Sequence, residues 1–232
     1  MALHPYYPQG VSLSSAIFVE NDLPVATLIS AFAAGLTVIL GSVLFIARSV
    51  NPKLGMTDIG LILWFTMSGT IHLFFESFFV FNNSRIAGMQ TLFAQLWKEY
   101  ALSDSRYMFS DPLVLCMETW TVIIWGPLCF LTAVFITTSS PFRHPVQALV
   151  STGHLYGNLI YLSTSLYEDF YIGKKYYRPE PYYFWVYFVL MNLPWLVVPA
   201  FCLYSCFKES AKAFALFSKQ ETGDGPSSKK LL

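Results

Sequence analysis

Five stretches of the chain are almost entirely apolar, and each is long enough to cross a lipid bilayer as a helix. A membrane-spanning helix needs about 20 mostly apolar residues. The qualifying stretches are 24–47, 59–81, 113–137, 145–166 and 182–207. The pattern therefore predicts an all-α integral membrane bundle of five transmembrane helices, which forms one domain over residues 24–207.

The segments that flank and connect these stretches are more polar. Residues 1–23 precede the first span, and residues 82–112 form the longest connection. Within that connection, residues 92–100 mix apolar and charged positions like a short surface helix. The last segment, 208–232, has a polar composition that favours disorder.

Composition supports a lipid environment and excludes one class of partner. Hydrophobic residues make up 55% of the chain and charged residues 12%, about half of the ~25% charged share typical of soluble domains. The 14 basic and 14 acidic residues cancel, and no basic run or stripe is present, so we expect no nucleic-acid partner. The four cysteines lie in apolar stretches without CxxC spacing, which predicts neither a metal site nor a disulfide framework.

The distribution of basic residues predicts the orientation in the membrane. With five spans the two termini lie on opposite sides, and the side of the C-terminal tail carries eight of the 14 basic residues. Lys and Arg are enriched on the cytosolic side. We therefore expect the C-terminal tail to lie in the cytosol and residues 1–23 to lie in the lumen. Lys229 and Lys230 near the C-terminus have the form of a retrieval signal for the endoplasmic reticulum. The expected location is therefore the endoplasmic reticulum membrane.

Ionisable side chains within the apolar stretches are the strongest functional signal. His72 and Glu76 lie in the second stretch and Glu118 in the third. A charged group at the centre of a membrane helix costs about 2.5–3.5 kcal/mol, so such residues usually face a bundle interior and have a function. His72 and Glu76 are four residues apart and share a helix face. Because successive helices run antiparallel, Glu76 and Glu118 are expected in the same half of the membrane.

Other polar residues at similar depth complete a predicted cluster. Singly, each of them is a common packing or interhelical hydrogen-bonding residue, and His72 with Glu76 or a protonated Glu118 also has a purely structural interpretation. Prolines at 127, 194 and 199 permit kinks or a wider cavity. The additional polar candidates are Thr121, Tyr156, Asn158, Asn192 and Trp195.

A buried acid/base pair in an apolar cavity suits proton transfer to and from a lipophilic substrate. Isomerising an alkene requires protonation to a carbocation and removal of a different proton, and neither step needs a metal or cofactor. Glu118 suits the role of counter-ion to such a cation, and Trp195 suits that of a π face. The residues alone indicate an acid/base isomerase of a lipid that they do not identify.

Three short motifs carry a resemblance to a known family. QLWKEY at 95–100, DSRY at 104–107 and CMET at 116–119 occur in this order, and the chain resembles the emopamil-binding protein family of the EXPERA superfamily. Members of that family are sterol Δ8-Δ7 isomerases. The resemblance extends over nearly the whole chain except the tail, including Ile71-His72-Leu73 with Glu76, and Met191-Asn192 with Trp195.

The resemblance implies a five-helix protein of the endoplasmic reticulum that pairs as a homodimer and uses no cofactor. It also implies that a sterol double bond moves from C8–C9 to C7–C8, and that cationic amphiphilic amines inhibit by resembling the carbocation. His72 and Glu76 would handle the proton, and Glu118 would face the C8 cation. The implied substrate-binding residues are Tyr107, Thr121, Tyr156, Asn192 and Trp195.

Two departures from the family pattern leave the substrate open. Asn158 stands where an acidic residue is expected, and Pro194 lies between Asn192 and Trp195. One alternative is an isomerase of a related triterpenoid or other polycyclic isoprenoid. Another is a non-catalytic sterol- or drug-binding protein, because one fold serves several functions. A transporter is disfavoured, since the five spans show no paired halves.

Overall fold

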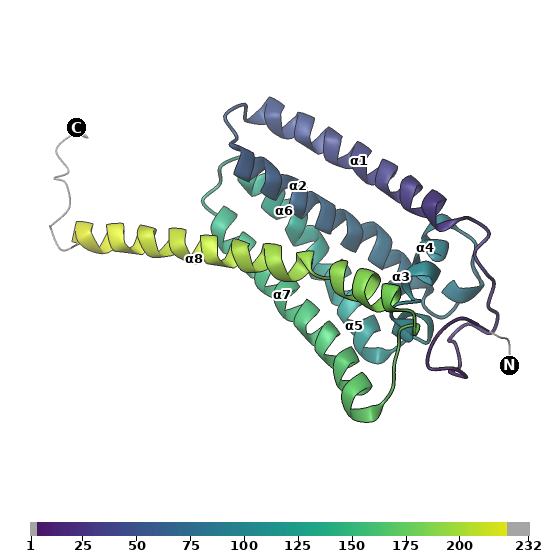
Figure 1. Cartoon of the computed structure of the whole chain (residues 1–232). Coiled ribbons are helices and arrows are strands. Elements are labelled where there is room, and N and C mark those ends of the chain that lie inside the picture. The colour runs from purple at the N-terminus through teal and green to yellow at the C-terminus, as the bar shows by residue number, and fades with distance from the viewer. Residues whose placement is uncertain (1–3, 222–232) are drawn as a thin grey trace.

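The computed structural model describes residues 4–221, and all regular structure within that range is helical (Figure 1). The elements are α1 (Val25–Val50), α2 (Met56–Thr70), η1 (Ile71–Glu76), α3 (Ser77–Asn82), η2 (Ile86–Gly88), α4 (Leu92–Tyr100), η3 (Ser105–Met108), α5 (Pro112–Trp120), η4 (Thr121–Trp125), α6 (Gly126–Thr137), α7 (Arg143–Tyr167), η5 (Glu168–Ile172), η6 (Tyr183–Leu190) and α8 (Pro194–Glu221). The predicted all-α class is confirmed for the described residues.

Four helical stretches of residues 4–221 are long and apolar enough to cross a membrane. They are Val25–Val50, Met56–Asn82, Pro112–Thr137 and Tyr183–Glu221, which correspond to the first, second, third and fifth predicted spans. The fourth prediction coincides with α7, which is 25 residues long but is not among the four. Polar side chains such as Gln147, His154 and Asn158 lower its hydropathy.

Three of the long helices are interrupted by π-helical turns. The turn η1 joins α2 to α3, η4 joins α5 to α6, and η6 precedes α8. Pro127 follows η4 by two residues, and Pro194 begins α8 after η6; a proline has no N–H to continue the helical ladder. Such turns often occur at functional sites, and η1 contains both His72 and Glu76.

Two glycines permit the close helix contacts around η1 and η4. A Cβ at Gly126 would lie 2.8 Å from the Leu73 side chain, and one at Gly153 would lie 2.6 Å from the Trp125 indole. Any larger residue at either position would push α6 away from η1, or α7 away from η4. The glycines therefore allow three helices to meet at the level of His72.

Three segments far apart in sequence pack together at one end of the bundle, and we call residues 4–23, 83–111 and 173–182 the cap. Backbone hydrogen bonds connect them: Val19 donates to Ala87 (2.9 Å), Ser105 to Tyr176 (3.0 Å), and Arg178 to the carbonyl of Leu102 (3.0 Å). In Figure 1 the N-terminal segment accordingly lies beside α4.

The helix predicted over residues 92–100 forms with those bounds, but its predicted surface position is wrong. Ala94, Trp97 and Lys98 of α4 are all buried. The Trp97 indole stacks on Phe75 of η1 with ring centroids 4.4 Å apart. The apolar positions that made α4 look amphipathic pack against the membrane helices, while the N-terminal segment covers its other side.

The last helix is longer than the sequence analysis predicted. Instead of ending at residue 207, α8 continues to Glu221 and projects beyond the bundle (Figure 1). Residues 208–221 are rich in Ala, Lys and Glu and contain neither glycine nor proline, so helix propensity outweighs their polar character. The expectation of disorder is therefore wrong for this part of the tail. Lys229 and Lys230 lie outside the described residues.

Candidate active site

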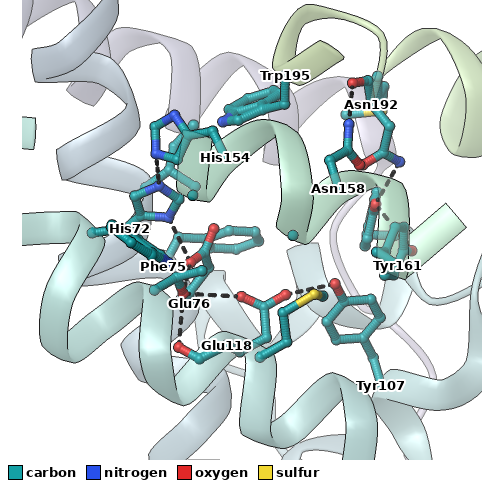
Figure 2. A pocket seen from close by; sticks show the side chains of 18 of the residues that line it. His72, Phe75, Glu76, Tyr107, Glu118, His154, Asn158, Tyr161, Asn192 and Trp195 are labelled. Atoms are coloured by element: carbon teal, nitrogen blue, oxygen red, sulfur yellow. Dashed lines mark hydrogen bonds and ion pairs between the residues drawn. The ribbon is translucent and has the colours of Figure 1, made fainter. Parts of the chain in front are cut away.

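A cavity of about 240 Å³ opens between the helices and the cap. Its wall is mostly apolar and aromatic, with contributions from α1, η1, α4, η3, α5, η4, α7 and α8. Figure 2 shows that the polar side chains gather in two places, with His72, Glu76 and Glu118 on one side and Asn158 and Asn192 on the other.

His72 and Glu76 form a buried pair, as their spacing predicts. The Nδ1 of His72 lies 2.7 Å from Oε2 of Glu76. His72 is 4% exposed, and the side chain of Glu76 is 12% exposed. Both residues belong to η1 and line the cavity. A base and an acid are thus held in direct contact at the edge of an apolar space.

Thr121 links this pair to Glu118. Its hydroxyl donates to Oε2 of Glu76, and it also lies 2.7 Å from the Glu118 carbonyl and 3.4 Å from Glu118 Oε2. A hydroxyl has only one hydrogen to donate, so Thr121 serves one of these acceptors at a time. The predicted proximity of the two carboxyl groups is confirmed, with one small hydroxyl between them.

Tyr107 holds Glu118 from the other side. Its hydroxyl donates to Oε1 of Glu118 over 2.6 Å, and Glu118 is only 5% exposed. Tyr107 belongs to η3 in the cap, where its ring packs on Trp97 with centroids 4.7 Å apart. Burial, with a contribution from the Glu118 charge, raises the pKa of Tyr107 well above its usual value. At neutral pH the phenol therefore remains a hydrogen-bond donor.

The two carboxyl groups have different surroundings. Glu76 contacts an imidazole that can carry a positive charge, whereas Glu118 is hydrogen-bonded by the hydroxyl of Tyr107. Neighbouring acids in unlike environments commonly take different roles in one reaction. The arrangement suits one carboxyl that exchanges a proton with histidine and another that faces developing positive charge.

The opposite wall carries a separate polar group. Asn158 Nδ2 donates to the backbone carbonyl of Asn192 (2.9 Å), and Asn192 Nδ2 donates to the Tyr100 hydroxyl (3.3 Å). Burial raises the pKa of Tyr100 to about 12, and its hydroxyl lies 3.5 Å from that of Tyr161. Trp195 also lines the cavity, with its ring 5.4 Å from that of Trp64.

The structure brings together seven of the eight predicted site residues and leaves out one. Tyr156 does not line the cavity and is 67% exposed. It lies two positions after His154, which places it about 200° further around α7, on the outer face. The expected position of Tyr156 at the cavity is therefore wrong. The residues that line the cavity as predicted are His72, Glu76, Tyr107, Glu118, Thr121, Asn192 and Trp195.

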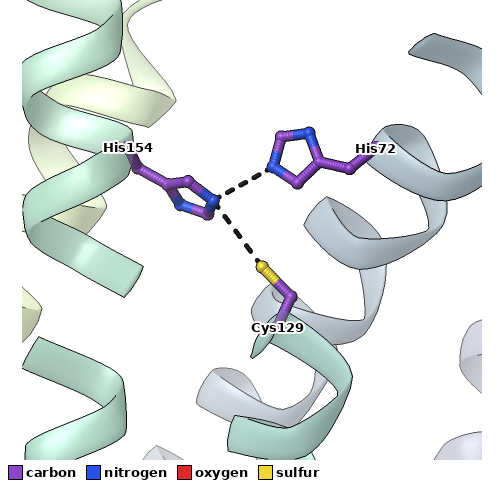
Figure 3. Close-up of side chains that lie close together, drawn as sticks. All are labelled: His72, Cys129 and His154. Carbon is purple, nitrogen blue, oxygen red and sulfur yellow. Dashed lines mark hydrogen bonds between the residues drawn. The ribbon is translucent and has the colours of Figure 1, made fainter. Parts of the chain in front are cut away.

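His154 is the residue that the sequence analysis missed. Its Nε2 lies 3.0 Å from Nε2 of His72 and 3.6 Å from Sγ of Cys129 (Figure 3). All three side chains are buried, and their ligand atoms lie within 4.8 Å of one another, a spacing that a metal ion would permit. The available signal was an ionisable residue inside a predicted span. That no metal is bound remains a prediction from the sequence.

Comparisons with known proteins agree with this chemistry. Residues 92–206 match the family EXPERA (EXPanded EBP superfamily). A protein of Mus musculus named 3-beta-hydroxysteroid-Delta(8),Delta(7)-isomerase is 36% identical over 216 residues, which cover 91% of this chain and 90% of the mouse protein. A rice protein named as a probable isomerase of the same kind is 31% identical over 91% of this chain and 94% of its own. An isomeliandiol synthase of Melia azedarach is 30% identical over 71% of this chain and 75% of its own.

Proposed function

The chain belongs to the EXPERA superfamily, and because an acid/base cluster lines its apolar cavity, we propose that it is a sterol isomerase that moves a ring double bond from C8–C9 to C7–C8. The observation that carries this proposal is the hydrogen-bonded series of His72, Glu76, Thr121 and Glu118 along one wall of the cavity. The relatives named as Δ8-Δ7 isomerases support the choice of substrate.

The reaction is a proton exchange without net oxidation or reduction. A proton adds to C9 of the C8=C9 bond, and the electron pair of the π bond forms the new C–H bond. C8 then carries the positive charge, and loss of a proton from C7 gives the C7=C8 bond. His72 with Glu76 handles the protons, because these two groups exchange one through a direct hydrogen bond.

Glu118 stabilises the intermediate in this proposal. Its carboxylate faces the C8 cation and is held in place by the Tyr107 hydroxyl, with the Thr121 hydroxyl 3.4 Å from its other oxygen. Trp195 offers a π face to the same charge, and Asn192 contributes a polar contact at the other wall. A protonated amine attached to an apolar body resembles the cation, so cationic amphiphilic amines are expected inhibitors.

The proposed setting follows from the family and from the sequence. The protein crosses the endoplasmic reticulum membrane five times, with α7 as the fourth span in chain order in addition to the four strongly apolar ones, and it acts as a homodimer. Lys229 and Lys230 would serve as the retrieval signal. Contacts between α7 and its neighbours α6 and α8 support its place within the bundle.

A second candidate is an isomerase of a related triterpenoid or other polycyclic isoprenoid. Two observations favour it: the relative named isomeliandiol synthase, and Asn158 in place of the expected acidic residue. Asn158 lies on the wall opposite the acid/base cluster, where it would contact a different part of the substrate and change the preferred substrate without changing the proton chemistry.

The test is incubation of the purified protein in liposomes with a Δ8 sterol, in parallel with Glu118→Gln. The matched control is Glu209→Gln, which changes a partly exposed glutamate on α8 outside the cavity. Conversion to the Δ7 isomer by the wild type and by the control, lost in Glu118→Gln, is the expected result. Tight sterol binding without conversion would refute the isomerase and favour a binding protein, and conversion of only a triterpenoid would favour the second candidate.

A further inference from the structure

We propose that His154 is a positioning residue of the proton-handling pair: it supplies the hydrogen-bond partner that allows His72 to carry a second proton within an apolar wall. The inference rests on the proposed isomerase function and deepens it. Both ring nitrogens of His72 are in contact, Nδ1 with Glu76 at 2.7 Å and Nε2 with His154 at 3.0 Å. His72 is therefore the middle member of a series.

Counting the hydrogens defines what His154 does. An ionised Glu76 only accepts, so Nδ1 of His72 carries a hydrogen. In neutral His72 the Nε2 is then a bare lone pair, and the hydrogen between the rings belongs to Nε2 of His154. When His72 takes up a second proton, its Nε2–H becomes the donor and Nε2 of His154 must accept. A neutral histidine at 154 meets both requirements by changing its tautomer. Its Nε2 hydrogen passes to Nε2 of His72 while its Nδ1 takes up the incoming proton, so the two rings together gain one proton and His154 stays neutral.

The surroundings provide no other partner for Nε2 of His72 among the described residues. His72 and His154 are 4% and 5% exposed. The titratable groups facing the two rings are Glu76 on η1, Glu118 on α5 and Cys129 on α6, and Cys129 contacts His154 rather than His72. Without His154, a doubly protonated His72 would leave an N–H unpaired in an apolar environment, which is strongly unfavourable.

The tautomer change also depends on Nδ1 of His154, the ring nitrogen that faces away from His72. Nδ1 of His154 is buried and has no hydrogen-bond partner. In the tautomer whose Nε2 accepts, Nδ1 of His154 carries a hydrogen that has no partner. This N–H belongs to a neutral ring, so leaving it unpaired costs less than leaving an N–H of the charged His72 unpaired. Nδ1 of His72, in contrast, is fixed by Glu76.

A metal ion on His72, His154 and Cys129 is the competing interpretation, and two features disfavour it. The two Nε2 atoms are 3.0 Å apart, a hydrogen-bond distance, whereas two nitrogens bound to one tetrahedral zinc ion are separated by about 3.4 Å. A divalent cation there would also occupy the lone pair of His72 that the relay needs, and its charge would oppose a carbocation in the adjoining cavity.

The experiment compares His154→Gln with His154→Leu in the isomerisation assay over a range of pH. A glutamine amide both donates and accepts, so His154→Gln should keep kcat within about 10-fold of the wild type. Leucine does neither, and His154→Leu should lower kcat about 100-fold. The alkaline limb of its pH profile should also move to lower pH, because the doubly protonated form of His72 is lost sooner. Cys129 contacts His154 but does not line the cavity, so Cys129→Ala should retain the wild-type kcat and pH profile.

Three results would overturn the inference while leaving the isomerase intact. One is wild-type kcat and pH profile in His154→Leu. A second is equal loss of kcat in both variants with unmoved pH limbs, which would mean that only the ring shape matters. A third is stoichiometric zinc in the purified protein that Cys129→Ala removes. If His154→Leu does not fold, His154→Met replaces it, with binding of the Δ8 sterol as the check of folding. Absence of turnover in the wild type itself would instead refute the proposed function.

Discussion

The protein contains two buried pairs of an acidic and a basic side chain, and they differ in whether the basic member can lose its proton. Asp104 and Arg106 form one pair in the cap, 0% and 1% exposed. His72 and Glu76 form the other, in η1. Only the second pair lines the cavity. The comparison separates a charge that holds the structure from one that is available for chemistry.

All three guanidinium nitrogens of Arg106 donate hydrogen bonds. Nε and Nη2 of Arg106 bind the two oxygens of Asp104 at 2.9 and 2.6 Å, and Nη1 donates to Thr164 on α7 at 2.9 Å. Burial works to lower the pKa of Arg106, but Asp104 reverses this and raises it above its usual value. The pair thereby fastens η3, with Tyr107 next to Arg106, onto α7.

The histidine pair has the opposite character. An arginine keeps its proton under all physiological conditions, whereas histidine is the side chain that gains and loses one near neutral pH. Its second nitrogen faces another titratable ring instead of a fixed acceptor. Burial alone therefore does not mark a pair as a candidate for catalysis, because Asp104 and Arg106 are buried as well. Access to the cavity and a titratable base distinguish His72 and Glu76.

Replacing Asp104 with asparagine should have the largest effect on stability. Arg106 would remain charged and buried without its carboxylate, and breaking a buried pair in this way typically costs about 3–5 kcal/mol. The free energy of unfolding of Asp104→Asn in detergent measures the loss. The control is Asp58→Asn, which removes the half-exposed partner of Arg143, a pair 2.7 Å apart; it should cost less than about 1 kcal/mol. Equal losses of unfolding free energy in the two variants would show that the buried pair stabilises the protein no more than the partly exposed one.

The same chemical change in the other pair should act on the reaction instead. In Glu76→Gln, His72 is left without its carboxylate but can become neutral, so we expect a change in unfolding free energy below about 1 kcal/mol. Turnover should fall about 10²–10⁴-fold, because the proton is no longer exchanged with a carboxyl group. Turnover of the Δ8 sterol and unfolding are measured on the same preparation. A stable, fully active Glu76→Gln would remove Glu76 from the proton-handling role.

Features that depend on the period, rise and direction of the helices were predictable from the sequence. The apolar stretches predicted where the long helices lie, and the i, i+4 spacing predicted the contact between His72 and Glu76. The meeting of Glu76 and Glu118 followed from antiparallel neighbours at equal depth. These inferences need only the period and rise of a helix, which sequence position determines.

Features that depend on how separate segments pack were not predictable in the same way. The cap joins three segments through backbone hydrogen bonds, which a pattern of side chains does not predict. The packing of these segments buries α4. Tyr156 and Asn158 were both candidates on α7, but only the packing of α7 decides which face meets the cavity. His154 is different, because its position within an apolar stretch was visible and its meaning became clear only beside His72.

The smallest expected effect concerns Lys98, a buried base of the cap that, unlike Arg106, can lose its proton. Its Nζ donates to the carbonyl of Val19 at 2.7 Å and to Gln90 at 2.8 Å. Burial lowers the pKa of Lys98 to about 8, against an opposing effect of Asp22, whereas an unfolded lysine titrates near 10.4. Between these values the unfolded chain binds more protons than the folded one, so this contribution to stability increases as the pH rises.

The expected size of the increase is about 1 kcal/mol between pH 8 and pH 9. Lys98→Met keeps the apolar stem and removes the charge, so the unfolding free energy of the wild type should increase by that amount relative to that of Lys98→Met over this pH step. For Lys53→Met, on the exposed connection between α1 and α2, the difference in unfolding free energy from the wild type should not change over this pH step. A constant difference for Lys98→Met would mean that Lys98 keeps its proton through this range, as Arg106 does. Lys98 and Arg106, the two buried bases of the cap, would then both keep their charge over this range, unlike the titratable His72 at the cavity.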